Sequence, residues 1–274
     1  MPLGPRGEAD VTGPIVTLTT DFGLADAFVG LVKAGILARC PTARIVDLTH
    51  LLPSYGIEAG AFWIERSFRS FPPGTVHLGV VDPGVGTPRR IVLVQQAGQL
   101  FLGPDNGLLG PIAGLAGAVV RAVTLDFLQS EGITELSPTF HGRDLFAPLA
   151  GLLAQGTRVP QEVGPVIGDW QRSPGPGPAQ SAGRIRGRVL IIDKFGNCFS
   201  DIRSELLVER KDLEGFVADR RLPWVRTYGD RPDGSLVALV NAFGVVEVAC
   251  VGGHAARALG LQPGDPVEVR YADP

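Results

Sequence analysis

A proline- and glycine-rich stretch divides this chain into two parts with different patterns of apolar residues. The stretch runs from Gln171 to Gly183 (QRSPGPGPAQSAG), and its three prolines and three glycines exclude a regular helix or strand there. Before it, strand-like and helix-like patterns alternate over residues 14–170, which predicts an α/β domain with a mostly parallel sheet. After it, strand-like runs separated by turns predict a smaller all-β domain, a barrel or a sandwich, over residues 184–274. We therefore expect two domains joined by a linker at 171–183.

The individual elements follow from the spacing of the apolar residues. In the first part, we expect strands at Ile15–Thr19, Ile45–Leu48 and Val76–Val81, and helices over Ala27–Arg39, Glu58–Phe71 and Leu145–Ala154. The last of these helices should be capped near Asp144. In the second part, we expect strands at Ile185–Ile192, Cys198–Ile202, Leu236–Val240, Val245–Val251 and Val267–Tyr271.

Charge and composition exclude several classes of protein. A net charge of −3 gives no reason to expect nucleic acid or an anionic membrane as a partner. Residues 1–13 lack the apolar core of a signal peptide, and the longest apolar stretches, such as Pro111–Val120, are too short to span a membrane. Three scattered cysteines, Cys40, Cys198 and Cys250, disfavour a disulfide framework and favour a reducing compartment. We expect a soluble, cytoplasmic protein.

The loop after the third expected strand carries the most chemical information. The apolar run Val76–Val81 stops at Asp82, and a Pro/Gly-rich stretch then leads to Arg89 and Arg90. A carboxylate at the end of a buried strand is costly to desolvate unless it is paired or functional. If the loop returns Arg89 to Asp82, an anion and a cation are fixed at the sheet edge where α/β proteins bind ligands. A bracing salt bridge is the alternative, but the glycines and prolines favour close approach of a ligand.

Two further aspartates share this edge if the strands are parallel. Asp21 follows the first expected strand, and Asp47 lies at the end of the second. Asp21 or Asp26 could instead cap the first helix, and Asp47 could brace a turn. For Asp47 we favour bracing. For Asp21 we favour function, because the tight turn Thr20–Gly23 presents its carboxylate, and a carboxylate at this address commonly binds a ribose diol.

His141 is the histidine with the most functional context. It precedes a helix within Thr139–Asp144, and backbone N–H groups converge on anions at helix starts. It would join Asp82 and Arg89 only if the fold brings the three together. Structural roles are expected for His50, His77 and His254. No histidines have metal-ligand spacing, so we expect no metal, and the lack of a Gly-x-Ser-x-Gly elbow disfavours a serine hydrolase.

Two Phe-Gly turns follow expected strands in the second part. The segments Asp193–Asn197 and Asn241–Gly244 both suit hairpin turns. Glu247 lies inside an otherwise apolar strand, and a buried glutamate needs partners. An adenine amino group and a structural hydrogen bond are equally good candidates for that partner.

Six motifs in this order resemble one family. They are Thr19-Thr20-Asp21-Phe22-Gly23, Val81-Asp82-Pro83-Gly84-Val85-Gly86-Thr87, Pro104-Asp105-Asn106-Gly107, Phe140-His141-Gly142-Arg143-Asp144, Asp193-x-Phe195-Gly196-Asn197 and Asn241-x-Phe243-Gly244. From about Ile15 onward, the chain resembles the S-adenosyl-L-methionine (SAM) hydrolases that form adenosine. These are also called SAM hydroxide adenosyltransferases and are relatives of the fluorinases and chlorinases.

The resemblance implies an architecture and a set of roles. Family members pair an α/β domain with a small β-barrel-like domain and form trimers, with each site between the first domain of one subunit and the second domain of its neighbour. The family's water-handling residues correspond to Asp82, Arg89 and His141, and its ribose-binding aspartate corresponds to Asp21. The other implied substrate-binding positions are Tyr55 at the sugar, Asn197, Glu247 and the backbone near Cys250 at adenine, Asp193 at the methionine amino group, and Tyr228, Ala242 and Phe243.

Two departures from related sequences bear on function. The family often has Ser where this chain has Ala242, so one polar contact to the ligand is lost. The halogenases carry hydroxyl-bearing residues where this chain has Asp82, Val85 and Gly142.

The reaction implied by the resemblance is hydrolysis of SAM to adenosine and L-methionine, by in-line attack of water on C5′. The leaving group is a neutral thioether, so neither a metal nor a cofactor is needed. Asp82 would orient or deprotonate the water, Arg89 would hold Asp82 ionised, and His141 would fix the water's position.

Two alternatives remain open from the sequence. A SAM-dependent halogenase is the lesser enzymatic alternative, because the carboxylate of Asp82 would repel a halide ion. A non-catalytic SAM- or adenosine-binding protein would retain Asp21, Asn197 and Glu247, but it would not need Arg89 or His141.

Overall fold

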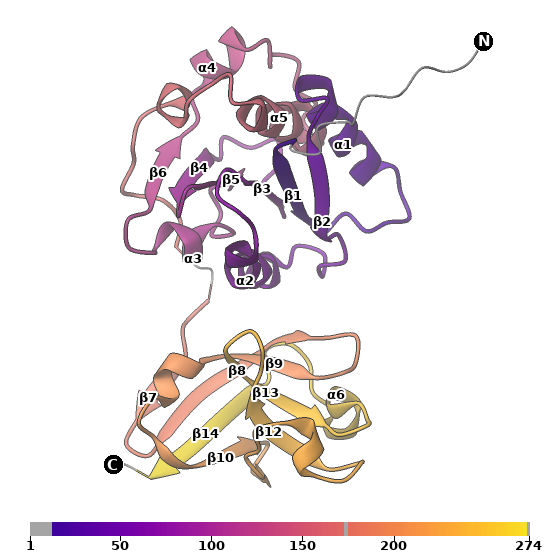
Figure 1. Cartoon of the computed structure of the whole chain (residues 1–274), viewed down its shortest axis with the longest axis vertical. Coiled ribbons are helices and arrows are strands. Elements are labelled where there is room, and N and C mark those ends of the chain that lie inside the picture. Colours follow the sequence, from indigo (N-terminus) through magenta and orange to yellow (C-terminus); the bar gives the residue numbers. More distant parts are fainter. Residues whose placement is uncertain (1–12, 173–174, 273–274) are drawn as a thin grey trace, which may run out of the picture. The chain divides into compact units, whose positions relative to one another are not determined.

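A computed structural model describes residues 13–172 and 175–272, which form two compact units, Met1–Pro174 and Gly175–Pro274 (Figure 1). The division between the units falls inside the Pro/Gly-rich stretch 171–183. Residues 173 and 174 of that stretch lie outside the described residues. Residues 1–12, where we expected no signal peptide, also lie outside them.

The first unit is built on a six-stranded sheet in the order β2-β1-β3-β5-β4-β6. The strands are β1 (Ile15–Thr20), β2 (Arg44–Thr49), β3 (Val76–Val80), β4 (Ile91–Gln96), β5 (Gln99–Pro104) and β6 (Val119–Ala122). Strands β2, β1, β3 and β5 run parallel, whereas β4 and β6 are antiparallel to their neighbours. The predicted mostly parallel α/β sheet is confirmed, but β4, β5 and β6 were not among the expected strands.

Helices cover both faces of this sheet (Figure 1). Helices α1 (Phe28–Arg39) and α5 (Ala147–Gln155) pack together on one face, and α2 (Ile57–Ser67) and α3 (Gly110–Ala113) lie on the other. A further short helix, α4, spans Leu125–Ser130, and a 3-10 turn spans Pro160–Val163. The main core fills the space between the sheet and the first pair of helices with side chains such as Leu18, Ile36, Leu78, Phe146 and Leu149.

Two predicted helix boundaries in this unit were wrong. The helix expected over Glu58–Phe71 ends at Ser67 and continues as a 3-10 turn, Phe68–Ser70, because Phe71 precedes a proline and is extended. Before α5, residues Gly142–Phe146 form a π-helical turn, so Asp144 lies inside that turn rather than at a cap. Pro148 cannot donate a backbone hydrogen bond to this turn, which favours the irregular geometry.

The second unit is an antiparallel, nearly closed barrel-like sheet, as predicted. Its strand order is β11-β10-β14-β8-β9-β13-β12, and β7 pairs with β8. The predicted strands are β8 (Arg184–Ile192), β9 (Cys198–Arg203), β12 (Leu236–Val240), β13 (Val245–Cys250) and β14 (Pro266–Ala272). Three strands were not expected: β7 (Ala179–Ser181), β10 (Lys211–Val217) and β11 (Arg220–Leu222). Shorter elements are α6 (Ala255–Leu259) and 3-10 turns at Ser204–Leu207 and Tyr228–Asp230.

A single bridge between Trp224, just after β11, and Ala238 of β12 brings the two ends of this sheet together. The interior is lined by alternating apolar side chains, including Ile185, Val189, Val248 and Val269. Two hairpins, β8–β9 and β12–β13, therefore lie next to each other in the sheet through the pairing of β13 with β9.

Candidate active site

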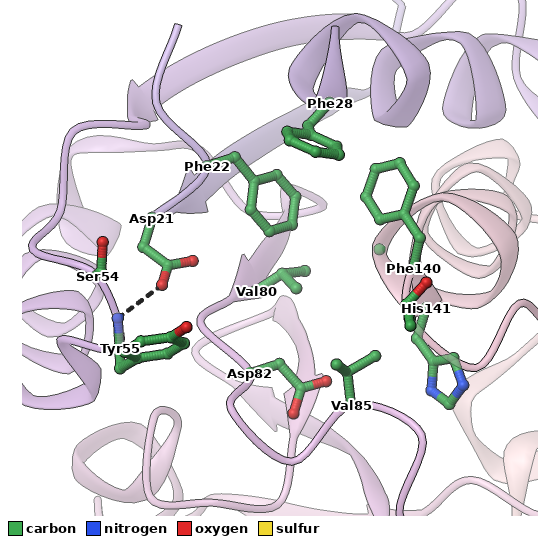
Figure 2. A pocket seen from close by; sticks show the side chains of 12 residues that line it. Asp21, Phe22, Phe28, Ser54, Tyr55, Val80, Asp82, Val85, Phe140 and His141 are labelled. Atoms are coloured by element: carbon green, nitrogen blue, oxygen red, sulfur yellow. Dashed lines mark hydrogen bonds between the residues drawn. The ribbon is translucent and has the colours of Figure 1, made fainter. Parts of the chain in front are cut away.

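A pocket opens at the carboxyl edge of the parallel strands in the first unit (Figure 2). In the register of the sheet, Thr20 at the end of β1 lies opposite Val80 at the end of β3, so the loops after both strands begin at the same level. Those loops carry Asp21 and Asp82. The pocket is lined by Asp21, Phe22, Phe28, Ser54, Tyr55, Val80, Asp82, Val85, Thr139, Phe140, His141 and Gly142.

Asp82 and Arg89 form a bidentate ion pair, as the sequence predicted. The guanidinium donates from Nε to Oδ1 of Asp82 at 2.6 Å and from Nη2 to Oδ2. The Asp82 and Arg89 side chains are only 5% and 10% exposed, respectively. A pair this buried differs from a surface salt bridge, because removal of one partner leaves a poorly hydrated charge.

The glycines of the loop allow the chain to pack closely on itself. Gly86 has a φ of +78°, and a Cβ atom placed there would lie 2.3 Å from the carbonyl oxygen of Pro138. The loop is therefore pressed against the segment that leads to His141. At Gly84, a Cβ would lie 3.3 Å from Cδ of Arg89. From the sequence, we expected these glycines to allow close approach of a ligand. In the structure, the groups that approach them closely belong to the protein itself.

His141 joins the ion pair. Its Nδ1 lies 3.1 Å from Nη2 of Arg89. A guanidinium can only donate, so Nδ1 accepts and the neutral ring carries its proton on Nε2. Burial, and then the positive charge of Arg89, lower the pKa of His141, which favours this neutral form. The fold thus brings Asp82, Arg89 and His141 together, although His141 is distant in sequence.

Asp21 occupies the opposite side of the pocket from His141 (Figure 2). Its Oδ2 accepts the backbone N–H of Tyr55 at 2.8 Å. Tyr55 has a φ of +63° and is 72% exposed, so its ring covers the pocket without being part of a core. Helix α1 begins after Ala27 without a side-chain cap, so the alternative that Asp21 or Asp26 caps this helix is wrong.

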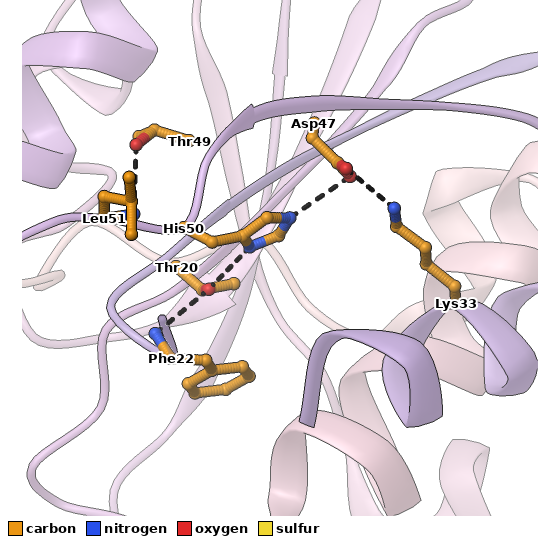
Figure 3. Close-up of polar contacts among 7 residues, drawn as sticks. All are labelled: Thr20, Phe22, Lys33, Asp47, Thr49, His50 and Leu51. Carbon is orange, nitrogen blue, oxygen red and sulfur yellow. Dashed lines mark hydrogen bonds and ion pairs between the residues drawn. The ribbon is translucent and has the colours of Figure 1, made fainter. Parts of the chain in front are cut away.

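Asp47 has the bracing role that we favoured (Figure 3). Its carboxylate accepts from Lys33 Nζ at 2.7 Å and lies 3.1 Å from Nε2 of His50. His50 is buried, and its Nδ1 lies 2.8 Å from Oγ1 of Thr20, the residue before Asp21. Burial tends to raise the pKa of Asp47, but the bonds from Lys33 and His50 outweigh it and lower that pKa. This network holds the turn that presents Asp21.

The other two histidines are also held by structural contacts. His77 lies in β3 between Oγ1 of Thr17, at 2.8 Å, and Oε1 of Gln99, at 2.5 Å. His254 precedes α6 and accepts the backbone N–H of Arg257 at 3.2 Å. Neither lines the pocket of the first unit.

An aromatic wall beside the catalytic candidates was missed by the sequence analysis. Phe22, Phe28 and Phe140 contact one another with ring centroids 5.2–6.1 Å apart, and all three line the pocket. Gly142 faces this wall, where a Cβ would lie 3.1 Å from both Phe22 and Phe140. Phe22 and Phe140 belong to two of the six family motifs, and this was the signal in the sequence that could have indicated the wall. The wall provides an apolar face opposite the charged groups.

The second unit has a pocket of its own, formed by the two Phe-Gly hairpin turns. In one turn, Oδ1 of Asp193 accepts the backbone N–H groups of Phe195 and Asn197, both at 2.9 Å. In the other, Oδ1 of Asn241 accepts those of Phe243 and Val245. The lining includes all seven positions expected to bind substrate in this part, namely Asp193, Asn197, Tyr228, Ala242, Phe243, Glu247 and Cys250.

Glu247 is the buried acceptor of this second pocket. It is 1% exposed, and Oε1 accepts the hydroxyl of Tyr228 at 2.6 Å. Burial raises the pKa of Glu247, although the bonds from Tyr228 and Asn241 oppose that change. The structural hydrogen bond considered from the sequence is therefore present. Since a carboxylate accepts several hydrogen bonds, this does not exclude an additional ligand donor.

Within residues 13–172 and 175–272, no group of three or more His, Cys, Asp or Glu side chains is arranged to hold a metal ion. Over the same residues, no helix has the length and apolar character needed to cross a membrane.

Comparison with known proteins identifies the family. The model of the SAM hydroxide adenosyltransferase N-terminal domain matches residues 16–164, and that of the C-terminal domain matches residues 187–268. The chain is 40% identical to the (R)-S-adenosyl-L-methionine hydrolase of Salinispora arenicola, covering 93% of this chain and 97% of the relative. A fluorinase from an Actinoplanes species is 28% identical, with 94% and 98% covered.

Among solved structures, an uncharacterised conserved protein from Thermotoga maritima superposes with a TM-score of 0.82. It is 31% identical, and the alignment covers 93% of this chain and 99% of that protein. The family models together span most of the chain, and the full-length relative exceeds 30% identity. The chain belongs to the SAM hydroxide adenosyltransferase family.

Proposed function

We propose that this protein hydrolyses SAM to adenosine and L-methionine. The observation that carries the proposal is the cluster formed by the buried Asp82–Arg89 pair and His141 beside an aromatic pocket. The relatives named (R)-S-adenosyl-L-methionine hydrolases support the choice of substrate.

In the proposed reaction, a water oxygen attacks C5′ of the ribose while the C5′–sulfur bond breaks. The electron pair of that bond goes to the sulfonium sulfur, which leaves as the neutral thioether of methionine. Asp82 orients the water and accepts its proton, while Arg89 fixes the carboxylate. The neutral ring of His141 donates from Nε2 to the water oxygen and sets its direction of attack.

We further propose how the two pockets divide the substrate. Asp21 takes the ribose diol and Tyr55 covers the sugar. In the second pocket, Glu247, Asn197 and the backbone near Cys250 take adenine, and Asp193 takes the methionine amino group. Tyr228 and Phe243 complete this pocket. Ala242 leaves out one hydroxyl that related proteins offer the ligand.

The proposal includes a homotrimer in which the first domain of one subunit and the second domain of its neighbour share a site. Residues 14–170 would carry the catalytic set, 171–183 would link the domains, and 184–274 would hold adenine and methionine. A reducing cytoplasm fits the free state of Cys40, Cys198 and Cys250.

Hydrolysis is favoured over halogenation by the charge of Asp82. Two unit negative charges 4 Å apart repel by about 4 kcal/mol at an effective dielectric constant near 20. Arg89 offsets part of this repulsion, but the carboxylate remains the pocket-lining group of the pair. A halide ion at the water position would therefore be less stable than water.

The test is incubation of the protein with SAM, with and without chloride, followed by chromatography of the products. Adenosine and methionine should form at the same rate in both cases. Formation of 5′-chloro-5′-deoxyadenosine would show a halogenase instead. Tight binding of SAM without turnover would identify a non-catalytic binding protein.

A further inference from the structure

The motif Pro104–Gly107 is the one sequence motif that the proposed site leaves without a role. It begins at Pro104, the last residue of β5, and β5 lies in the sheet between β3 and β4. Strand β3 leads into the loop that carries Asp82 and Arg89, and β4 leaves it. The end of β5 is therefore placed between the two stems of the catalytic loop. The first stem leads from β3 to Asp82, and the second leads from Arg89 to β4.

Asn106 holds the first stem. Its side-chain Nδ2 donates to the carbonyl oxygen of Val81 at 2.8 Å, and its Oδ1 accepts the backbone N–H of Leu108 at 3.1 Å. Val81 is fully buried and directly precedes Asp82. The amide of Asn106 thus fixes the peptide from which the Asp82 side chain departs.

Asp105 holds the second stem. Its backbone N–H donates to the carbonyl oxygen of Arg90 at 3.0 Å, and its Oδ2 accepts Nε of Arg90 at 2.8 Å. Its other oxygen accepts the backbone N–H of Gln171 at 2.7 Å, and the side chain is only 4% exposed. Arg90 directly follows Arg89 and also donates to Asp169 at 2.8 Å.

We infer that Asp105 and Asn106 act as a clamp that sets the positions of Asp82 and Arg89, so both are positioning residues for the reaction proposed above. Each contacts the residue next to one member of the ion pair, and neither lines the pocket. A bidentate pair requires both of its partners at fixed separation and direction. The clamp fixes this separation and direction from the end of the neighbouring strand β5. Only the effect on catalysis rests on the proposed function.

The sharpest test is Asn106→Asp, which keeps the size and Oδ1 but replaces the donor to Val81 with an oxygen. We expect kcat to fall about 10- to 100-fold because misplacement by about 1 Å has effects of this size. KM should stay within about twofold, since the substrate contacts are on other segments. Asp105→Asn, which keeps one acceptor oxygen but loses the charge facing Arg90, should give a smaller loss of the same kind.

The matched control is Thr124→Ala. Thr124 caps α4 by accepting the backbone N–H of Phe127 at 3.3 Å, and its hydroxyl donates to the carbonyl oxygen of Val163 at 3.4 Å, so both bonds are to residues outside 82–90. This variant should lower the melting temperature and leave kcat unchanged. If Asn106→Asp changed kcat by less than twofold, or if Thr124→Ala reduced kcat as much at an equal loss of melting temperature, the positioning role would be refuted.

Hydrogen exchange tests the clamp without any assumption about the reaction. Backbone amides of residues 82–90 should exchange faster in Asn106→Asp and Asp105→Asn than in the wild type, with exchange in residues 184–272 unchanged. Unchanged exchange in the loop would overturn the clamp. A wild-type protein that did not hydrolyse SAM would refute the proposed function alone, since loop exchange would still report on the clamp.

Discussion

At the scale of single residues, the buried Asp82–Arg89 pair couples the stability of the first unit to its proposed chemistry. Replacement of Asp82 by Asn would leave the Arg89 guanidinium without a counter-charge at a site only 10% exposed. We expect a loss of up to about 3–5 kcal/mol in the free energy of unfolding. The rate of SAM hydrolysis should fall by about 10²–10⁴-fold because the water loses its base.

These values are measured by urea unfolding and by product formation. The matched control is Arg221→Ala, which breaks an exposed ion pair with Glu214 and should cost less than about 1 kcal/mol. An Asp82→Asn protein with an unchanged rate would remove the proposed base even if hydrolysis itself were confirmed.

His77 should make the protein less stable in mild acid. Burial lowers the pKa of His77 from 6.5 to about 4. Between pH 6.5 and about 4 the unfolded chain therefore binds a proton that the folded chain does not, so stability falls as the pH falls. The expected loss across this window is about 3 kcal/mol, and it levels off below the folded pKa.

The measurement is the free energy of unfolding against pH for the wild type and for His77→Phe, which keeps a ring next to Phe101. The variant should be less stable at neutral pH, because it loses the bonds to Thr17 and Gln99, but its stability should fall less steeply below pH 6.5. An equally steep decline in both proteins would contradict this role of His77.

At the scale of elements, the catalytic loop depends on its contact with the segment before His141. Gly86→Ala would combine a positive φ with a clash against the carbonyl oxygen of Pro138. We expect a loss of about 2–3 kcal/mol and a kcat about tenfold lower, because the loop must move away from its neighbour. Chemical unfolding and steady-state kinetics measure the two effects.

Gly74→Ala is the control for backbone strain alone. Gly74 has a φ of +85°, and a Cβ there would meet nothing within 4 Å. It should cost about 1–2 kcal/mol without a change in kcat. If both variants gave equal losses of stability and equal rates, the contact with Pro138 would not position the loop.

At the scale of the whole molecule, the expected substrate-binding residues are divided between two units. Asp21, Tyr55, Asp82, Arg89 and His141 belong to the first unit, and the others line a pocket of the second. In the proposed trimer, each site takes its two parts from neighbouring subunits. Inactive subunits with defects in different units should therefore complement each other.

The test is co-expression of Asp82→Asn with Glu247→Gln subunits carrying different tags. Random assembly should leave about a quarter of the sites free of both changes, so activity below the KM for SAM should recover to about that fraction. Mixed Asp82→Asn and Arg89→Ala subunits should not recover, because both changes lie in the same unit. Sedimentation confirms the assembly, and a trimer without complementation would refute the shared site.

The sequence by itself determined the features that depend on local pattern. Two-residue and 3.6-residue periodicities predicted eight of the fourteen strands and the three longest helices of the described residues, because these periods reflect which face of an element is buried. The return of Arg89 to Asp82 was also predictable, since the two are seven residues apart and joined by a Pro/Gly-rich loop. The predicted helix boundaries were wrong where a proline altered the backbone, as at Phe71 and before α5.

Only the tertiary structure decided which distant segments meet. His141 lies 52 residues from Arg89, and its bond to that side chain depends on how α5 packs against the sheet. The antiparallel edge formed by β4 and β6, the aromatic wall around Phe22, and the contacts of Asp105 and Asn106 depend on strand order in the same way. Strand order and register are set by the summed burial of many side chains across the sheet, which no local stretch of sequence contains.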